Sequence, residues 1–169
     1  MTSKAVYPGT FDPFTNGHLD ITQRGARIFD ELTVAVSADS VKSATFSVEE
    51  RQMMIREAAA DIPNVRVVAF EGLLVDFMRR EHSRVILRGL RALSDFEYEF
   101  QFAQMNKQLA PETETFFIVT DAKYSYLSSR SVKEIFQLGG SIREFVPPVV
   151  LRRIEAHDAP PKKRKDRLE

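Results

Sequence analysis

The sequence contains no cysteine and no tryptophan, and its 24 basic residues are balanced by 24 acidic ones. Without cysteine, the chain has no disulfide, no thiolate zinc site and no cysteine nucleophile. With a formal net charge of zero, it has no overall field that attracts nucleic acid or an anionic membrane. An anion-binding site in this protein must therefore be built locally.

Long apolar runs are also missing. No stretch of about 18 apolar residues is present, so we expect no segment that spans a membrane. The first residues carry a single Lys4, followed by Pro8 and Gly9, without the apolar centre of a signal peptide. We therefore expect a cytoplasmic protein with neither nucleic acid nor membrane as a partner.

The length of 169 residues fits one domain. We assign residues 1–156 to this domain and residues 157–169 to a disordered polar tail, because the sequence "APPKKRKDRLE" lacks a periodic apolar face. The "KKRK" run resembles a nucleic-acid or targeting patch. Asp166 and Glu169 dilute its charge, which favours a solvated tail.

The domain alternates β-like and helical patterns. Ser47 with Glu50, and Ser94 with Glu97, fit capping boxes that begin two of the helices, and we expect a left-handed cap at Gly139. Strands are predicted at residues 4–7, 32–38, 65–70, 84–88 and 115–120, and helices at residues 17–29, 47–61, 73–81, 94–109, 128–138 and 149–156. This order predicts an α/β fold with a doubly wound, five-stranded parallel sheet.

Unusual residues follow the strands of this predicted sheet. The loops "PGTFDPFTNGH", "DSVKSA", "RGLRA" and "DAKYSYLSSR" each come directly after a strand. In open α/β sheets, ligands bind at the carboxyl ends of the strands. We expect that edge to be cationic and rich in hydroxyl groups, which suits an anion with several phosphates. The residues that these loops contribute are Thr10, His18, Lys42, Arg88, Arg91, Lys123, Ser128, Ser129 and Arg130.

A single histidine near a helix start is more often a structural hydrogen bonder than a catalyst. His18 is predicted to lie in the first turn of a helix, where free backbone N–H groups and the helix dipole attract phosphate. Gly17 before it permits a ligand to approach the backbone closely. These two features favour a functional role for His18.

Three motifs together resemble the phosphopantetheine adenylyltransferase family. They are "TNGH" at residues 15–18, "RGLRALSDFEYEFQFAQMN" at residues 88–106, and "YSYLSSRSVKEI" at residues 124–135. The first motif is similar to the His/Thr-x-Gly-His signature of a wider group of nucleotidyltransferases. The second is specific to the pantetheine branch. The resemblance covers residues 4–155 and implies a Rossmann-like nucleotidyltransferase fold.

The resemblance implies that ATP and 4′-phosphopantetheine react to give dephospho-coenzyme A and pyrophosphate. The acceptor phosphate is already anionic, so it would attack the α-phosphate in line, without a general base or a covalent intermediate. Mg²⁺ would accompany ATP, held mostly by phosphates and water, with no metal-ligating residue in the protein. Coenzyme A would act as a feedback ligand, and the family implies a homohexamer.

The resemblance also implies roles for individual residues. Thr10 and His18 would donate to the α-phosphate and the attacking oxygen, while Lys42 and Arg88 would hold the phosphate of phosphopantetheine. The β- and γ-phosphates would be held by Arg91, Ser128 and Ser129, and the catalytic set is Thr10, His18, Lys42, Arg88 and Arg91. Other residues expected to bind ATP are Phe11, Gly89, Leu90, Glu99, Tyr124, Ser125, Tyr126, Leu127 and Arg130. The pantetheine arm would contact Leu73, Leu74, Phe102, Met105 and Asn106, although core packing is an equal interpretation for Leu73, Leu74 and Met105.

The chain departs from the family pattern at four places. The "DSVKSA" loop lacks a common proline, Leu74 and Phe136 replace a frequent Met and Ala, and Arg130 stands where a small hydroxyl residue is usual. Arg130 would either contact the β- or γ-phosphate or pair with Glu134 on the same helix.

Two other functions are compatible with the first motif. A nucleotidyltransferase acting on nicotinate mononucleotide or glycerol phosphate would usually have His at Thr15 and lack "RGLRALSDFEYE". A non-catalytic nucleotide-sensing module would have little reason to keep Lys42 and Arg88 as a clamp for the acceptor phosphate.

Overall fold

Five parallel strands form the centre of the fold in this computed structural model, which describes residues 2–39 and 44–157. The strand order is β3-β2-β1-β4-β5, so the chain winds outward from β1 in both directions. This order confirms the predicted doubly wound sheet. The strands are β1 (Lys4–Gly9), β2 (Glu31–Ser37), β3 (Val65–Phe70), β4 (Val85–Leu90) and β5 (Glu114–Val119).

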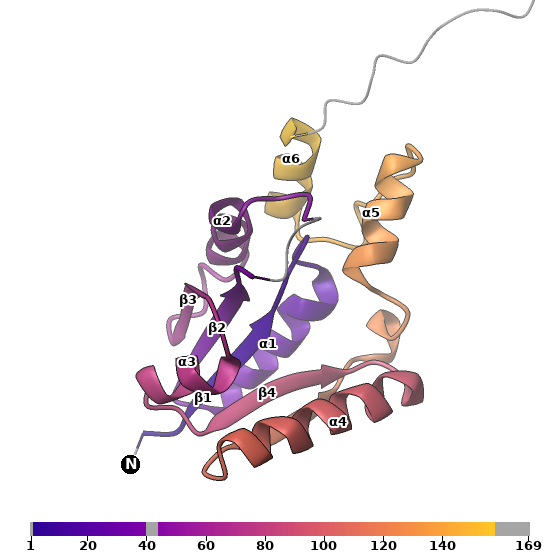
Figure 1. Ribbon diagram of the computed structural model, residues 1–169. Helices are drawn as coiled ribbons and strands as arrows, with labels where there is room; N and C mark the ends of the chain where they lie inside the picture. Colours follow the sequence, from indigo (N-terminus) through magenta and orange to yellow (C-terminus); the bar gives the residue numbers. More distant parts are fainter. Residues whose placement is uncertain (1, 40–43, 158–169) are drawn as a thin grey trace, which may run out of the picture.

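Helices cover both faces of the sheet, with α3 and α4 on the near side in Figure 1 and α1 on the far side. Alternate strand residues bury on opposite faces. Tyr7 packs in the cluster that includes residues of α1 and α2, whereas Val6 packs with Phe77 and Met78 of α3. The helices are α1 (Asn16–Ile28), α2 (Val48–Ala58), α3 (Leu74–Arg80), α4 (Leu93–Leu109), α5 (Ser129–Gln137) and α6 (Pro148–His157), with a 3₁₀ turn η1 at Ala122–Tyr124.

The ends of the helices test the predicted capping signals. The Ser47 box is confirmed, since the Ser47 N–H donates to Glu50 Oε2 at 2.8 Å and the Glu50 N–H donates to Ser47 Oγ at 3.2 Å. The Ser94 box is wrong, because α4 begins one residue before Ser94 and Ala92 is its N-cap. Gly139 is left-handed, with φ +80°.

The last helix reaches the predicted boundary between domain and tail. Helix α6 extends to His157, whose ring contacts the ring of Phe46. The division into a domain and a disordered tail stays a prediction. The remainder of the predicted tail lies outside the described residues.

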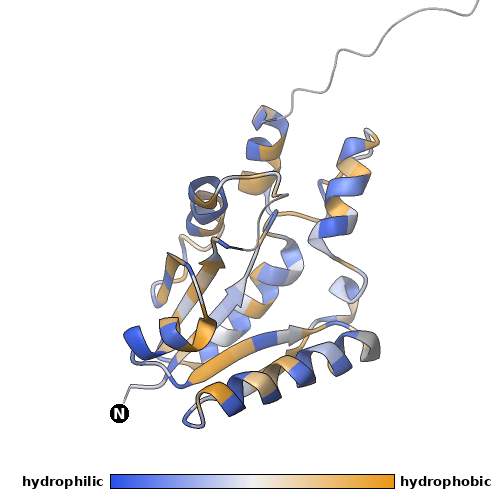
Figure 2. Ribbon diagram, viewed as in Figure 1, coloured by the Kyte–Doolittle hydropathy of each residue, from blue (hydrophilic) through white to orange (hydrophobic). Residues whose placement is uncertain are grey.

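Strand β4 shows how the sheet separates core from site. Ile86 and Leu87 are fully buried, while the next residue, Arg88, is partly exposed. Figure 2 shows the same change, from hydrophobic in the first half of β4 to a short hydrophilic segment near the middle of the strand. Because all five strands are parallel, their carboxyl ends lie at one edge of the sheet. None of the helices in the described part of the chain combines the length and apolarity needed to cross a membrane.

Candidate active site

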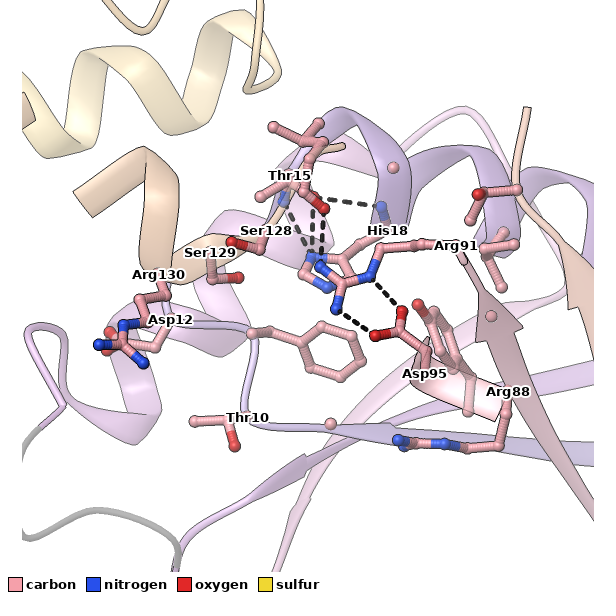
Figure 3. A pocket seen from close by; sticks show the side chains of 18 of the residues that line it. Thr10, Asp12, Thr15, His18, Arg88, Arg91, Asp95, Ser128, Ser129 and Arg130 are labelled. Atoms are coloured by element: carbon pink, nitrogen blue, oxygen red, sulfur yellow. Dashed lines mark hydrogen bonds and ion pairs between the residues drawn. The ribbon is translucent and has the colours of Figure 1, made fainter. Parts of the chain in front are cut away.

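A cavity of about 410 Å³ opens at this carboxyl edge. In Figure 3, Ser128, Ser129 and Arg130 line one side, Arg88 and Arg91 the other, and His18 lies between them. The predicted loops after β1, β4 and β5 therefore do meet at one site. Of the residues proposed from the sequence, its lining contains Thr10, Phe11, His18, Arg88, Gly89, Arg91, Glu99, Leu127, Ser128, Ser129 and Arg130.

The other proposed residues are not among the described residues that line the cavity. Lys123, expected at this edge, pairs instead with Asp121 at 3.6 Å. Lys42 lies outside the described residues. The residues that do not line the cavity are Leu90, Tyr124, Ser125 and Tyr126 of the proposed ATP set and Leu73, Leu74, Phe102, Met105 and Asn106 of the proposed pantetheine set.

The proposed pantetheine residues occupy α3, α4 and the N-cap of α3. Leu73 is 56% exposed and Met105 is 60% exposed, so neither is a core residue. Leu74 differs, because it packs against the cluster that contains Phe77. Core packing therefore explains Leu74 in part and leaves Leu73 and Met105 unexplained.

His18 occupies the third position of α1 and completes a capping box with Thr15. The Thr15 N–H donates to His18 Nδ1 at 3.0 Å, and the His18 N–H donates to Thr15 Oγ1 at 3.4 Å. The imidazole thus takes the place that Glu or Gln holds in the usual box. Because Nδ1 accepts a backbone N–H, the proton of the neutral ring is on Nε2. No hydrogen bond within the described residues uses Nε2, which lies at the cavity as a donor.

The environment of His18 disfavours its charged form. Burial, followed by the positive charges of Arg91 and Arg88, lowers the pKa of His18 from 6.5 to about 3. The ring is therefore a neutral hydrogen-bond donor at neutral pH. It is poorly suited to act as a general acid that carries a positive charge.

We expect the His18 ring of the ligand-free protein to remain neutral at about pH 5. Below pH 6.5 the unfolded chain takes up a proton that the folded protein does not bind until about pH 3. Acidification through this window therefore removes stability. An NMR titration of the ring nitrogens should show the Nε2–H tautomer at about pH 5, and urea unfolding should lose free energy less steeply with acid in His18→Gln. A midpoint near 6.5 for His18 would contradict this.

Gly9 and Gly17 both line the cavity, and the sequence predicts for Gly17 that a ligand can approach its backbone closely. A Cβ at Gly9 would lie 2.7 Å from the ring of Phe11, so Gly9 instead makes room for that buried ring. A Cβ at Gly17 would meet protein atoms only at 3.6 Å or more, an ordinary contact. Protein packing therefore explains why residue 9 is glycine. Packing does not require glycine at residue 17, where close approach of a ligand remains the prediction.

Most of the cations at the cavity are held by carboxylates. Arg88 forms a two-point pair with Glu99, with Nε donating to Oε2 at 2.6 Å and Nη2 to Oε1, and Nη1 donates to the carbonyl of Pro8. Burial is the largest single influence and opposes the charge of Arg88, but the hydrogen bonds to Glu99, the charge of Glu99 and the nearby Tyr7 and Tyr98 together raise the Arg88 pKa. Arg91 pairs with Asp95 in the same way, at 2.9 Å and 3.3 Å.

Arg130 differs from these two arginines. It is exposed, lines the cavity, and forms no ion pair with any described residue, including Glu134. It also lies in the first turn of α5, where the helix dipole disfavours a positive charge. The pair with Glu134 that the sequence left open is therefore not formed.

Sequence reasoning missed three charged residues of the cavity wall: Asp12, Asp95 and Lys133. Lys133 lies four residues after Ser129, on the same face of α5, and this spacing was a usable signal. Asp95 lies four residues after Arg91 and offered the same signal. Asp12 lies within the quoted loop after β1, but its type alone did not distinguish it from a turn residue.

The carboxylates of the cavity are not grouped as metal ligands. Asp12, Asp95 and Glu99 each pair with a different cation, Lys133, Arg91 and Arg88 respectively. In the described part of the chain, no three His, Asp or Glu side chains cluster as a metal site.

Comparisons with known proteins agree with the geometry of this site. A family sequence model described as cytidylyltransferase-like matches residues 6–135. A phosphopantetheine adenylyltransferase from Syntrophotalea carbinolica is 57% identical over 146 residues, which cover 86% of this chain and 88% of that protein. Those from Dictyoglomus turgidum and Clostridium tetani are 55% and 53% identical over 151 and 150 residues, in each case 89% of this chain and 94% of the relative. The chain belongs to the phosphopantetheine adenylyltransferase family.

Membership in the phosphopantetheine adenylyltransferase family makes the chain an enzyme of the nucleotidyltransferase class. The fold agrees. A crystal structure from Vibrio parahaemolyticus, assigned as a nicotinate-nucleotide adenylyltransferase, superposes with a TM-score of 0.68 over 93% of this chain and 95% of that chain. At 16% identity this likeness supports the fold alone.

Proposed function

We propose that the protein transfers the adenylyl group of ATP to 4′-phosphopantetheine, giving dephospho-coenzyme A and pyrophosphate in coenzyme A biosynthesis. The observation that carries this proposal is identity above 50% to phosphopantetheine adenylyltransferases over most of the chain. The cavity supports it, because a neutral donor lies among cations that suit phosphate groups.

The chemistry requires alignment rather than a base. The acceptor phosphate is anionic at neutral pH and attacks the α-phosphate in line, so no covalent intermediate forms. His18 Nε2–H donates to the oxygens on which charge develops, together with Thr10. Arg88 and Lys42 hold the acceptor phosphate. Arg91 and the start of α5, with Ser128, Ser129 and Arg130, hold the phosphates that leave as pyrophosphate.

Mg²⁺ enters as part of the substrate, as the complex with ATP. Because the cavity carboxylates are each paired with a cation, phosphate oxygens and water supply most of its ligands. The proposal also includes coenzyme A as a feedback ligand, since coenzyme A contains the whole pantetheine arm. It further includes a cytoplasmic location and, from the family resemblance, a homohexameric assembly.

The test is to incubate the purified protein with ATP and Mg²⁺ and to follow release of pyrophosphate with each candidate acceptor in turn. 4′-Phosphopantetheine should support turnover, whereas nicotinate mononucleotide, glycerol phosphate and unphosphorylated pantetheine should not. Turnover with nicotinate mononucleotide or glycerol phosphate alone would assign another acceptor. Nucleotide binding without turnover on any acceptor would support a sensing module.

Arg130 gives a prediction specific to this chain. If its guanidinium contacts the β- or γ-phosphate, Arg130→Ser should raise the KM for ATP about three- to tenfold, with a smaller change for the acceptor. Glu134→Gln is the matched control on the same helix and should change neither KM. Steady-state kinetics with each substrate varied in turn measures both values. An ATP KM within about twofold of wild type would place Arg130 on the helix surface.

A further inference from the structure

Asp12 is a buried carboxylate that connects three segments distant in the sequence. Its side chain is 5% exposed. Oδ1 accepts from the Phe46 N–H at 3.0 Å, and Oδ2 accepts from the Thr45 N–H at 3.0 Å and from Lys133 Nζ at 2.6 Å. A single carboxylate thus joins the loop after β1, the segment before α2, and α5.

Arg51 of α2 fixes the same corner from the opposite direction. It is 1% exposed, and Nη1 donates to the carbonyls of Thr10 at 2.7 Å and Ser37 at 3.1 Å. Its Nε donates to the carbonyl of Phe46 at 3.1 Å. Phe46 is therefore held at its N–H by Asp12 and at its carbonyl by Arg51. The segment before α2 cannot shift without breaking charged hydrogen bonds, which are the stronger kind.

The start of α5 is attached to the same loop. Ser129 Oγ donates to the carbonyl of Pro13 at 2.8 Å, next to the bond between Lys133 and Asp12. Helix α5 carries Ser128, Ser129 and Arg130, the proposed contacts of the leaving pyrophosphate. In Figure 3, Asp12 lies on the side of the cavity where Arg130 and Ser129 enter it.

We propose that Asp12 is a positioning residue for adenylyl transfer. Through Lys133 it fixes the start of α5, and through Thr45 and Phe46 it fixes the segment before α2, so that α5 and this segment keep a set separation at one side of the cavity. In-line transfer depends on such alignment, and a misplacement of about 1 Å can cost about 10²-fold in rate. The inference rests on the proposed function and adds a residue that contacts neither substrate.

Two substitutions test the contacts of Asp12 separately. Asp12→Asn keeps the shape of the side chain and one acceptor oxygen but loses the charge that holds Lys133. Lys133→Met removes the contact between Asp12 and α5 and leaves those with Thr45 and Phe46 in place. We expect Asp12→Asn to lower kcat by at least about tenfold and to raise the KM of both substrates. Lys133→Met should raise the ATP KM at least about threefold and leave the acceptor KM within about twofold.

The control is Asp30→Asn. Asp30 Oδ2 also accepts a backbone N–H, that of Ser3 at 2.7 Å, but it lies just before β2, at the opposite end of the strands from the cavity. It should leave kcat and both KM values unchanged. Thermal unfolding of every variant sets an assay temperature at which each is folded.

Three results would overturn the proposal. The first is that Asp12→Asn and Lys133→Met both keep kcat and KM within about twofold of wild type. Asp12 would then have a purely structural role, whatever the loss in Tm. A lower ATP KM in Asp12→Asn would show that Asp12 competes with ATP for Lys133. If Asp12→Asn does not fold, Lys133→Met alone decides, and an unchanged ATP KM overturns the proposal. If wild-type protein releases no pyrophosphate, the proposed function fails instead. Calorimetry of MgATP binding then tests Asp12, and an unchanged affinity in Lys133→Met overturns its positioning role.

Discussion

His18→Ala is expected to lower kcat by about 10²–10³ while leaving the affinity for ATP nearly unchanged. The lost group is the Nε2–H donor, whose bond strengthens as charge develops on the α-phosphoryl oxygens. The capping box keeps this donor in one tautomer, because Nδ1 is occupied by the Thr15 N–H. Single-turnover and steady-state assays with 4′-phosphopantetheine measure kcat, and calorimetry measures ATP binding.

The same substitution also weakens the start of α1, since the Thr15 N–H loses its acceptor. Thr15→Ala is the comparison for this second effect. It removes the hydroxyl of the N-cap, which lies 3.1 Å from His18 Nδ1, at a cost of about 1 kcal/mol in unfolding free energy, but it keeps the backbone N–H that donates to Nδ1. Its kcat should fall far less than that of His18→Ala. If His18→Ala keeps more than about a tenth of the wild-type kcat, the role of His18 is wrong.

The sequence predicted the fold because its local signals agree with the tertiary structure. The run of residues 32–36 is buried on both faces, as its continuous apolar character indicates. Ser47 begins α2 because its side chain and that of Glu50 satisfy each other's N–H groups. At Ser94 the same pattern failed, since the Asp95 N–H already bonds to the carbonyl of Ala92 and α4 starts earlier.

The site was predictable where it follows from topology. Parallel strands bring their exit loops to one edge, so His18, Arg88 and Ser128 could be placed together before the structure was known. The supporting charges could not. Arg51 follows two glutamates and reads as part of a solvated helix face, yet it is buried among backbone carbonyls. Burial of a charge depends on which segments converge on it, and local sequence does not contain that information.

Arg88→Ala is expected to lower kcat/KM for 4′-phosphopantetheine by about 30-fold or more, with a much smaller effect on the ATP KM. Its bonds to Glu99 and Pro8 still leave a second N–H on Nη1 and on Nη2 for an anion. Truncating one partner of a buried charge pair across a binding interface, here the proposed pair of Arg88 and the acceptor phosphate, costs about 2–5 kcal/mol in binding. The substitution also leaves a negative charge inside the protein unpaired. That charge is Glu99, whose side chain is 12% exposed and would then repel the acceptor phosphate.

This repulsion makes a second variant informative. In the Arg88→Ala background, Glu99→Gln removes the unpaired charge and should recover part of the lost kcat/KM, whereas in the wild-type background it should lower activity by releasing Arg88. Opposite signs in the two backgrounds give a coupling energy for the pair. Equal weakening of ATP and acceptor by Arg88→Ala would show that Arg88 does not hold the acceptor phosphate. A Glu99→Gln effect of the same size and sign in both backgrounds would show that Glu99 acts independently of Arg88.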